Sequence, residues 1–490
     1  MYTRIAYLEL KTYKKVPNKV MHNKANPEKP SWRDYQAKLK DLTVKKKSLK
    51  NTLKVSAASV VLVASFCVMI SGFGSKAYFY AIRKLNPPSE ASLDAHDIPN
   101  NFIDKRDVQD LLDGKSFLNL KDKSFNFVAD GLKLQVDTSL DIGLQHYLLK
   151  SLNLSTSRYI GIVGMDPATG RILSMVGYDK ADQAGNPCVD SKFPAASIFK
   201  IVTAAAAIEK CGFNLDSMFT YNGRKHTLYK SQLKERSNRY TNKITFSDSF
   251  AQSVNPVFGK IGAHYLGKTT LENYAAAFGF NRNIDFEIQL APSQIALSDD
   301  PYQWAEIASG FNRQTKMSPL HGALITSAIL NQGRLVEPTI VDQIKDENGR
   351  VMYRSQMTTI NQAITPAASK IVNHLMETTI SSGTCKKTFR GFENDRILSR
   401  LNIGGKSGSI GSGSHDARYD WFVGFAEEKE GTAKIVISVV VAHEKYIGTR
   451  ASQYARMAIK QYFRSYFANN ATVQPLSHKG TKKENHYAGF

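Results

Sequence analysis

Apolar residues run together in four short segments that predict two β-hairpins. Residues 159–165 and 172–176 are apolar runs separated by a loop that is rich in turn-forming residues. Apolar runs of this length, bounded by Pro and Gly, are typical of buried strands. Near the other end of the chain, residues 421–425 and 435–442 repeat the pattern around a charged turn. A final amphipathic helix is predicted over 450–467.

Between the hairpins the apolar positions change to helical spacing. A helix is predicted over 140–152, with Asp137, Thr138 or Ser139 as its N-terminal cap. Another is predicted over 318–333, beginning with a Ser-Pro pair and ending at a glycine. The order is hairpin, helical insert, hairpin, helix. It predicts an α+β fold, in which an antiparallel sheet with terminal helices and a helical subdomain enclose a cleft.

The first part of the chain has a different composition. Residues 55–74 are 20 consecutive residues without a charge, and residues 1–54 hold 15 Lys or Arg against 4 Asp or Glu. A helix of about 20 apolar residues can cross a bilayer, and basic flanks stay on the cytoplasmic side. We therefore predict a basic cytoplasmic stub over 1–54, a single transmembrane helix over 55–74 and an exported remainder, in preference to a cleaved signal peptide.

The exported part divides by composition into three segments. Residues 75–134 are predicted to form a linker and a small strand-rich module, 135–467 the main domain, and 468–490 a polar, disordered tail. Half of the formal net charge of +22 lies before the predicted span, which argues against a nucleic-acid partner.

The exported cysteines are Cys188, Cys211 and Cys385, and they have no metal-ligand spacing. Buried free thiols are the expected state of all three. A disulfide between Cys188 and Cys211 is the alternative in an oxidising compartment.

The sharpest chemical feature is Ser197 followed three residues later by Lys200, at the start of an Ala-rich helical run. Three-residue spacing places both side chains on one helix face. A serine hydroxyl becomes a nucleophile when a base takes its proton, and a desolvated lysine can be that base. Ser231 and Lys234 repeat the spacing inside a strongly basic stretch, which is more typical of a solvated surface.

Two further short motifs follow in the chain. Ser253 and Asn255 form a Ser-x-Asn motif within a run that resembles a helix, where a polar helix surface is the alternative interpretation. Lys406, Ser407 and Gly408 lie in the sequence Gly-Gly-Lys-Ser-Gly-Ser, which predicts a strand edge facing a ligand. A flexible glycine-rich loop is the competing interpretation of this third motif.

The three motifs in this order resemble the transpeptidase domain of penicillin-binding proteins. The resemblance covers roughly 135–467 and implies a β-lactamase/transpeptidase-like fold with its active site in the cleft. It implies that Ser197 attacks a D-alanyl-D-alanine stem peptide of peptidoglycan, Lys200 acts as base and Ser253 relays the proton. Asn255 would then hold the peptide. The backbone N–H groups of Ser197 and Ser409 would form the oxyanion hole.

The same resemblance implies the rest of the site. Lys406, with Ser407 or Ser409 beside Gly408, would bind the terminal carboxylate. β-Lactams would acylate Ser197, and no metal or organic cofactor would be needed. The partners would be stem peptides, the bilayer through residues 55–74 and other cell-wall synthesis proteins. The location would be the bacterial cytoplasmic membrane, with the catalytic domain on its outer side.

The chain departs from the family pattern before the nucleophile, where Pro194-Ala195-Ala196 replaces a common Pro-Gly. A Gly-Gln-Gly segment of the family is replaced near Ser309 and Gly310.

Other functions stay open at this stage: a D,D-carboxypeptidase, a β-lactamase, or a non-catalytic penicillin-binding sensor or scaffold. A β-lactamase needs a base for deacylation, and Glu287 has a suggestive spacing. Alternating apolar residues around Glu287 predict instead that it points outward.

Overall fold

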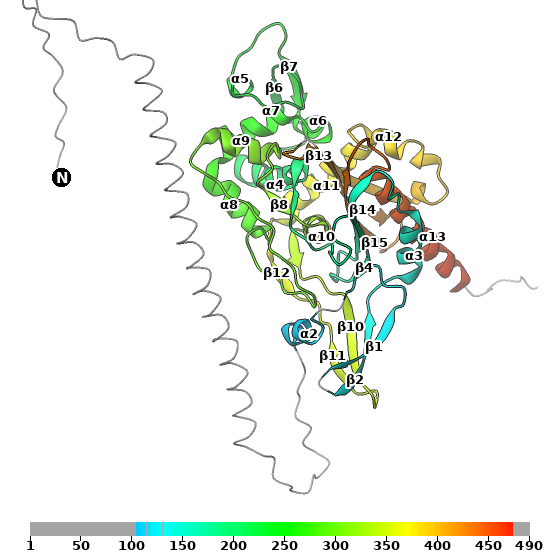
Figure 1. The fold of residues 1–490 in the computed structure, drawn as a ribbon. Helices are drawn as coiled ribbons and strands as arrows, with labels where there is room; N and C mark the ends of the chain where they lie inside the picture. The colour runs from blue at the N-terminus through cyan, green and yellow to red at the C-terminus, as the bar shows by residue number, and fades with distance from the viewer. Residues whose placement is uncertain (1–103, 114–115, 130, 415, 474–490) are drawn as a thin grey trace, which may run out of the picture. The chain divides into compact units, whose positions relative to one another are not determined.

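The structure is a computed structural model that describes residues 104–113, 116–129, 131–414 and 416–473 (Figure 1). All of them belong to the second of two compact units, Asn100–Phe490. The predicted stub over 1–54, the predicted span over 55–74 and most of the tail lie outside the described residues. No helix in the part of the chain that the structure describes combines the length and apolar character that crossing a bilayer requires.

A five-stranded antiparallel sheet forms the centre of the unit, in the order β13-β14-β15-β3-β4. Its strands are β13 (Leu401–Gly411), β14 (Arg418–Glu428), β15 (Lys434–His443), β3 (Ser157–Met165) and β4 (Ile172–Asp179). β3 and β4 pair as one hairpin, and β14 and β15 as another, so both predicted hairpins are confirmed. β15 pairs with β3 and joins the two ends of the domain, which leaves β13 as an edge strand.

Two hydrophobic clusters cover the two faces of this sheet. On one face, Phe422 and Val439 pack with residues of α3 (Ile142–Ser151) and α13 (Ala451–Val473). On the other, Trp421 and Val440 join a larger core that includes α10 (Pro319–Leu330) and the helical subdomain. Figure 1 shows the sheet between these two sets of helices. The predicted α+β fold is therefore confirmed.

The helices begin where polar side chains can accept their first N–H groups. Ser318 caps α10 by accepting from the N–H of His321 at 3.1 Å, as its sequence predicts. For α3 the predicted caps are wrong, because Asp141 is the cap and accepts from Leu144 N at 3.0 Å. The predicted caps at 137 and 138 lie instead at the extended end of a strand. α13 continues to Val473, so the predicted disordered tail begins inside a helix.

A second, smaller antiparallel sheet combines distant parts of the chain in the order β1-β2-β10-β11. Its strands are β1 (Ser124–Ala129), β2 (Leu132–Thr138), β10 (Val341–Asp346) and β11 (Val351–Arg354). The predicted boundary at Gln135 falls within β2, where Gln135 pairs with Lys345 of β10. The strands before and after that position thus share one sheet, and a short helix, α2 (Lys105–Leu111), precedes it.

The helical subdomain lies between β4 and β13 in the chain. Its helices are α4 (Lys200–Cys211), α5 (Lys230–Leu233), α6 (Phe246–Ala251), α7 (Asn255–Lys260), the π-helical turn η2 (Ile261–Leu266), α8 (Gly267–Ala277), α9 (Pro301–Ser309) and α11 (Pro366–Ser381). The short helix α12 (Lys386–Phe389) follows them and packs with α13 on the opposite face of the sheet. Three two-stranded ribbons connect them: β5 (Phe193–Pro194) with β8 (Lys316–Met317), β6 (Met218–Tyr221) with β7 (Asn242–Thr245), and β9 (Arg334–Val336) with β12 (Thr359–Gln362).

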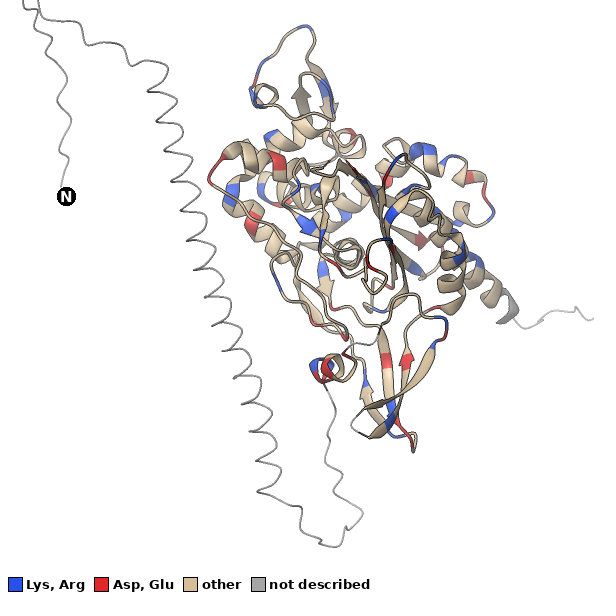
Figure 2. Cartoon of the chain, in the orientation of Figure 1, with Lys and Arg blue, Asp and Glu red and all other residues tan. Residues whose placement is uncertain are grey.

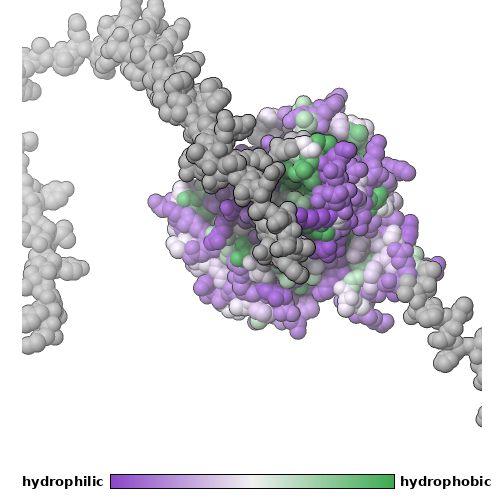
Figure 3. Space-filling model, turned by 90° about the horizontal axis from the view of Figure 1, so that it is seen from below, coloured by the Kyte–Doolittle hydropathy of each residue, from purple (hydrophilic) through white to green (hydrophobic). Residues whose placement is uncertain are grey.

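Short 3₁₀ turns complete the described unit: η1 (Ala196–Phe199), η3 (Phe392–Asn394) and η4 (Leu398–Arg400). The face of the described unit seen in Figure 3 is mostly hydrophilic, with small hydrophobic patches scattered between polar side chains. The apolar residues of the described chain thus gather mainly in the two clusters around the sheet.

The thiols of Cys188, Cys211 and Cys385 are all free. Cys188 and Cys385 are buried, whereas Cys211 is half-buried at the end of α4. Burial raises the pKa of the Cys188 thiol to about 12, so this side chain acts as a small apolar group between β3 and β4.

Candidate active site

The segment that carries Ser197 is held between the sheet and the helical subdomain. The Trp421 Nε1–H of β14 donates to the carbonyl of Pro194 at 2.9 Å, and β5 pairs with β8. The chain then enters the 3₁₀ turn η1, which contains Ser197, and continues directly into α4 with Lys200 as its first residue. Gly212 ends α4 in the left-handed conformation, at φ 68°. The predicted Ala-rich helical run after Ser197 is thus confirmed.

Lys200 lies beneath Ser197 and is fully buried. Its Nζ lies 2.9 Å from Ser197 Oγ and 2.8 Å from Asn255 Oδ1, and it also donates to the carbonyl of Ser309. Burial, and then the nearby charge of Lys406, lower the pKa of Lys200 well below its usual range. The contacts with Ser197, Asn255 and Ser309 determine how a neutral Lys200 amine is oriented.

A neutral amine has two N–H donors and one lone pair. The amide oxygen of Asn255 and the carbonyl of Ser309 can only accept hydrogen bonds, so they take the two N–H groups. The lone pair is then left for the hydroxyl of Ser197, which can donate to it. The arrangement therefore suits proton abstraction from Ser197 by Lys200.

Ser253 lies in a tight turn and not in a helix. Its φ is 58°, which is unusual for a residue with a side chain, and it separates α6 from α7. The predicted helical run through Ser253 is thus wrong, because a new helix, α7, begins just after it with Pro256 in its first turn. Asn255, the first residue of α7, donates from Nδ2 to the carbonyl of His226 at 3.1 Å. The turn directs both side chains toward α4 and β13.

Lys406 is an internal residue of strand β13, so the flexible-loop interpretation of the third motif is wrong. The side chain is fully buried, and its Nζ donates to Ser253 Oγ at 3.0 Å and to the carbonyl of Ser407 at 2.9 Å. Burial lowers the pKa of Lys406 to about 7. One hydrogen bond therefore joins the second motif to the third.

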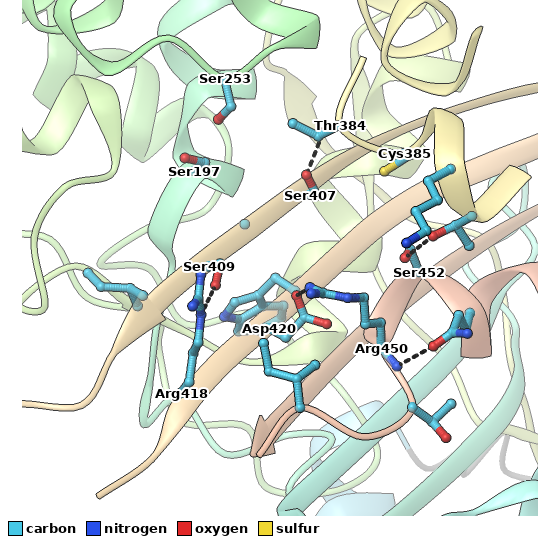
Figure 4. A pocket seen from close by; sticks show the side chains of 18 of the residues that line it. Ser197, Ser253, Thr384, Cys385, Ser407, Ser409, Arg418, Asp420, Arg450 and Ser452 are labelled. Atoms are coloured by element: carbon cyan, nitrogen blue, oxygen red, sulfur yellow. Dashed lines mark hydrogen bonds and ion pairs between the residues drawn. The ribbon is translucent and has the colours of Figure 1, made fainter. Parts of the chain in front are cut away.

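Gly408 lets β13 approach the nucleophile segment. A Cβ at Gly408 would lie 3.3 Å from the backbone N of Ser197, so a larger residue would press the strand away from η1. Beside it, Ser407 Oγ lies 2.6 Å from Thr384 Oγ1, and Ser409 Oγ accepts from Arg418 Nε at 2.8 Å. Figure 4 shows both contacts, with Ser197 and Ser253 on the opposite side of β13 from Arg418.

One cavity of about 1560 Å³ brings these residues together. Its lining includes six of the predicted site residues: Ser197, Ser253, Asn255, Ser407, Gly408 and Ser409. The two lysines lie beneath this lining, linked to it by the hydrogen bonds given above. The structure therefore places all eight predicted residues at one site.

Several contributors to the site are not evident from their local sequence. Ser309 at the end of α9 offers only its carbonyl, and Thr384 follows α11 without any motif. Gly310 has a φ of 66°, and a Cβ there would collide with the carbonyl oxygen of Ala196. A backbone contact between positions more than a hundred residues apart leaves no sequence signal except the glycine itself.

Two other sequence features lie outside the site. Ser231 and Lys234 are exposed on α5 and just after it, as predicted, and neither lines the cavity. Glu287 is fully buried, so the prediction that it points outward is wrong. Its carboxylate accepts from Tyr353 Oη at 2.9 Å and from Ile340 N at 3.0 Å.

Burial raises the pKa of Glu287, and its partners belong to β11 and to the segment before β10. It does not line the cavity. Glu287 therefore supports the small sheet and is not placed to activate water at Ser197.

The model of the penicillin-binding protein transpeptidase domain matches residues 160–462 of the chain. That is more than half of its length. The chain belongs to this family. The three motifs, their order and their convergence on one cavity agree with that membership.

Curated relatives include the stage V sporulation protein D of Bacillus subtilis, 24% identical over 63% of this chain and 50% of the relative. Penicillin-binding protein 1A of Neisseria gonorrhoeae is 26% identical over 58% of this chain and 32% of the relative. The peptidoglycan D,D-transpeptidase PbpA of Mycolicibacterium smegmatis is 22% identical over 57% of this chain and 61% of the relative. The chain thus spans about a third to three fifths of these relatives' lengths.

Solved structures share the fold. The D,D-transpeptidase domain of a peptidoglycan glycosyltransferase from Eggerthella lenta superposes with a TM-score of 0.56 at 23% identity, over 68% of this chain and 83% of that one. Penicillin-binding protein A of M. tuberculosis, as an imipenem acyl-enzyme, gives a TM-score of 0.55 at 20% identity. The match covers 67% of this chain and 79% of that one.

Proposed function

We propose that the protein is a peptidoglycan D,D-transpeptidase that forms an acyl-enzyme on Ser197 and is inhibited by β-lactams. The observation that carries the proposal is that two hydrogen-bonded groups of side chains meet at one cavity. Ser197 contacts Lys200, Lys200 contacts Asn255, and Lys406 contacts Ser253. Membership of the transpeptidase family supports the reaction class.

In the proposed acylation, Ser197 Oγ attacks the carbonyl carbon between the two terminal D-alanines of a stem peptide. Its proton passes to the Nζ of Lys200, and the C–O bond forms as the carbonyl oxygen becomes negative. The backbone N–H groups of Ser197 and Ser409 stabilise that oxyanion. The C–N bond then breaks, and Ser253 relays the proton to the departing nitrogen, which leaves as free D-alanine.

The Ser253–Lys406 contact suits this relay. Because Ser253 Oγ accepts a hydrogen bond from Lys406, its own hydroxyl proton is free to point toward the substrate. A cation beside the hydroxyl also stabilises negative charge on its oxygen while the proton moves. Asn255 holds the peptide through its amide group, in the same role that the sequence predicts.

Recognition of the substrate's terminal carboxylate falls to β13. Ser407 and Ser409 present hydroxyl groups along this edge strand, and Lys406 contributes positive charge from beneath. A β-lactam carries a carboxylate and a strained amide in similar relative positions, so it can occupy the same groups. Attack by the amine of a neighbouring stem peptide would complete the cross-link.

We further propose that residues 55–74 anchor the chain in the cytoplasmic membrane, with the described domain on the outer side. The uncharged run and the basic residues before it support this orientation. The substrate, a wall polymer outside the membrane, requires the same placement. Partners among cell-wall synthesis proteins belong to the same proposal.

Covalent labelling with fluorescent penicillin tests the function. The full chain should form a stable adduct that Ser197→Ala abolishes and the matched variant Ser231→Ala leaves intact. Rapid loss of the label would instead indicate a β-lactamase, and no labelling of the unaltered protein would indicate a non-catalytic scaffold. Product analysis with a stem peptide then separates transfer to an amine from hydrolysis, which a D,D-carboxypeptidase performs.

A further inference from the structure

The cavity continues well beyond the predicted catalytic residues. At about 1560 Å³ it is larger than the roughly 300–1,000 Å³ typical of sites for one small ligand. From Ser409 it passes Arg418 and Asp420 and reaches the α12–α13 side of the sheet (Figure 4). We name this extension the α13 arm, lined by Lys387, Arg450, Ser452, Arg456 and Lys460.

The arm is strongly basic. Six Arg or Lys side chains and one Asp line the whole cavity, and four of the six belong to the arm. α12 carries two lysines, Lys386 and Lys387, and Figure 2 colours the Lys and Arg residues of this part of the molecule blue. Positive charge concentrated along a cavity wall attracts anionic ligands and excludes cationic ones.

Part of that charge is not neutralised by the protein. Lys460 pairs with Asp395 at 2.5 Å, and Arg450 lies 3.9 Å from Asp420. Arg456 instead donates to the backbone carbonyl of Thr388 at 2.8 Å. Within the described residues, neither Arg456 nor Lys387 forms an ion pair with a carboxylate. Both cations therefore remain available to a ligand.

The chemistry of transfer identifies which substrate would lie there. Attack on the acyl-enzyme is the reverse of amine departure, so the acceptor amine must enter where the leaving D-alanine was. In the proposed function the leaving residue's carboxylate rests against Ser407 and Ser409. Once D-alanine has left, that end of the cavity is open, and it leads directly past Arg418 into the arm.

We propose that the α13 arm binds the acceptor stem peptide through carboxylates that lie away from its reacting amine. The acceptor nitrogen bonds to the acyl carbon, the ester bond to Ser197 Oγ breaks, and the proton lost by the amine returns to Ser197 through Lys200. This inference rests on the proposed transpeptidase function and adds where the acceptor peptide lies and which of its groups the site holds.

The inference is tested by measuring how one acyl-enzyme divides between transfer to an acceptor peptide and hydrolysis. The donor is a tripeptide ending in D-alanyl-D-alanine, and the acceptors are L-alanyl-γ-D-glutamyl-L-lysine and the same peptide with its carboxylates amidated. The ratio of transfer to hydrolysis is measured, because both products come from the same intermediate and the acylation rate cancels. The proteins are the full chain, the double variant Lys387→Gln/Arg456→Gln, and Arg354→Gln on β11 as a control that removes one positive charge outside the cavity.

The double variant should lower the ratio for the anionic acceptor by about fivefold to tenfold, as expected for lost charge-assisted contacts. The ratio for the amidated acceptor should change less than twofold, and Arg354→Gln should change neither. An equal change for both acceptors, or no change for either, would overturn the inference while leaving the proposed function intact. Failure of the unaltered chain to form any acyl-enzyme would instead reject the proposed function and this inference with it.

Discussion

Lys406 Nζ and Ser253 Oγ lie 3.0 Å apart, which joins the strand β13 to the turn between α6 and α7. Both lysines of the site are fully buried, and this burial, followed by the charge of Lys406, lowers the pKa of Lys200. The two groups have opposite requirements. Lys200 acts as a base when it is neutral, whereas Lys406 attracts a carboxylate when it is charged.

This opposition predicts a bell-shaped pH dependence for acylation. The second-order rate constant for penicillin should rise with pH as Lys200 loses its proton at its lowered pKa. It should fall again as pH rises through about 7, where Lys406 becomes neutral. Because the lysines interact, the two limbs describe the pair and not the separate residues. The measurement is the rate of covalent labelling between pH 5 and 10.

Lys406→Arg separates the two limbs, because arginine stays charged throughout this range. The variant should retain a fraction of the acylation rate, and its alkaline limb should disappear below pH 10. If that limb stays near pH 7 in the variant, Lys406 is not the group that controls it.

Lys200→Gln should reduce the acylation rate constant by about 10²- to 10⁴-fold, the usual contribution of a general base. The matched control is Lys234→Gln, which removes the lysine of the second Ser-x-x-Lys sequence from an exposed position. Melting temperatures of both variants establish that they fold. Acylation of a folded Lys200→Gln protein at nearly the normal rate would mean that another group takes the proton from Ser197.

The parts of this site that the sequence predicts are those with local causes. The spacing of Ser197 and Lys200 places both on one helical face, and short apolar runs predict the hairpins that border the cleft. The glycines around Lys406 predict a strand edge that another segment can approach closely, and in the structure Gly408 of β13 lies against η1. The convergence of these motifs on one cavity follows from family resemblance and not from the pattern of residues alone.

Long-range contacts explain the predictions that are wrong. Alternation around Glu287 predicts an exposed carboxylate, yet Thr339 and Tyr353, 52 and 66 residues later, provide buried hydrogen bonds to it. Ser253 has a positive φ in the turn before α7, and its hydroxyl meets Lys406 of β13, 153 residues later. Apolar periodicity reflects the residues of one segment at a time. It therefore gives no information about hydrogen-bond partners that come from distant segments.

Gly310→Ala should destabilise the protein by about 2–4 kcal/mol, since it adds both backbone strain and a collision with Ala196. Gly212→Ala isolates the first contribution. Gly212 has a similar φ of 68° but open space around its Cβ position, so about 1 kcal/mol is expected. Chemical denaturation measures both values.

Acylation should also fall in Gly310→Ala, because the displaced backbone carries Ser309 on one side and Ser197 on the other. Equal destabilisation by the two glycine variants would contradict the close approach of these segments.

His321 on α10 should make the fold sensitive to acid. It is buried beside Phe280, its Nε2 lies 2.7 Å from the carbonyl of Phe278, and its Nδ1 has no hydrogen-bond partner among the described residues. Burial lowers the pKa of His321 to about 4, below its unfolded value near 6.5. The folded state therefore favours the neutral ring, and the unfolded state binds the proton more readily.

This contribution to stability is fully present above pH 6.5 and is lost as pH falls from 6.5 to about 4. A difference of this size corresponds to about 3 kcal/mol at most. His321→Gln keeps a side-chain donor for the carbonyl of Phe278 and cannot titrate, so its free energy of unfolding should decline less steeply over that interval. Denaturation curves at pH 7, 6, 5 and 4 give the comparison. Parallel slopes for the two proteins would show that His321 does not cause the acid sensitivity.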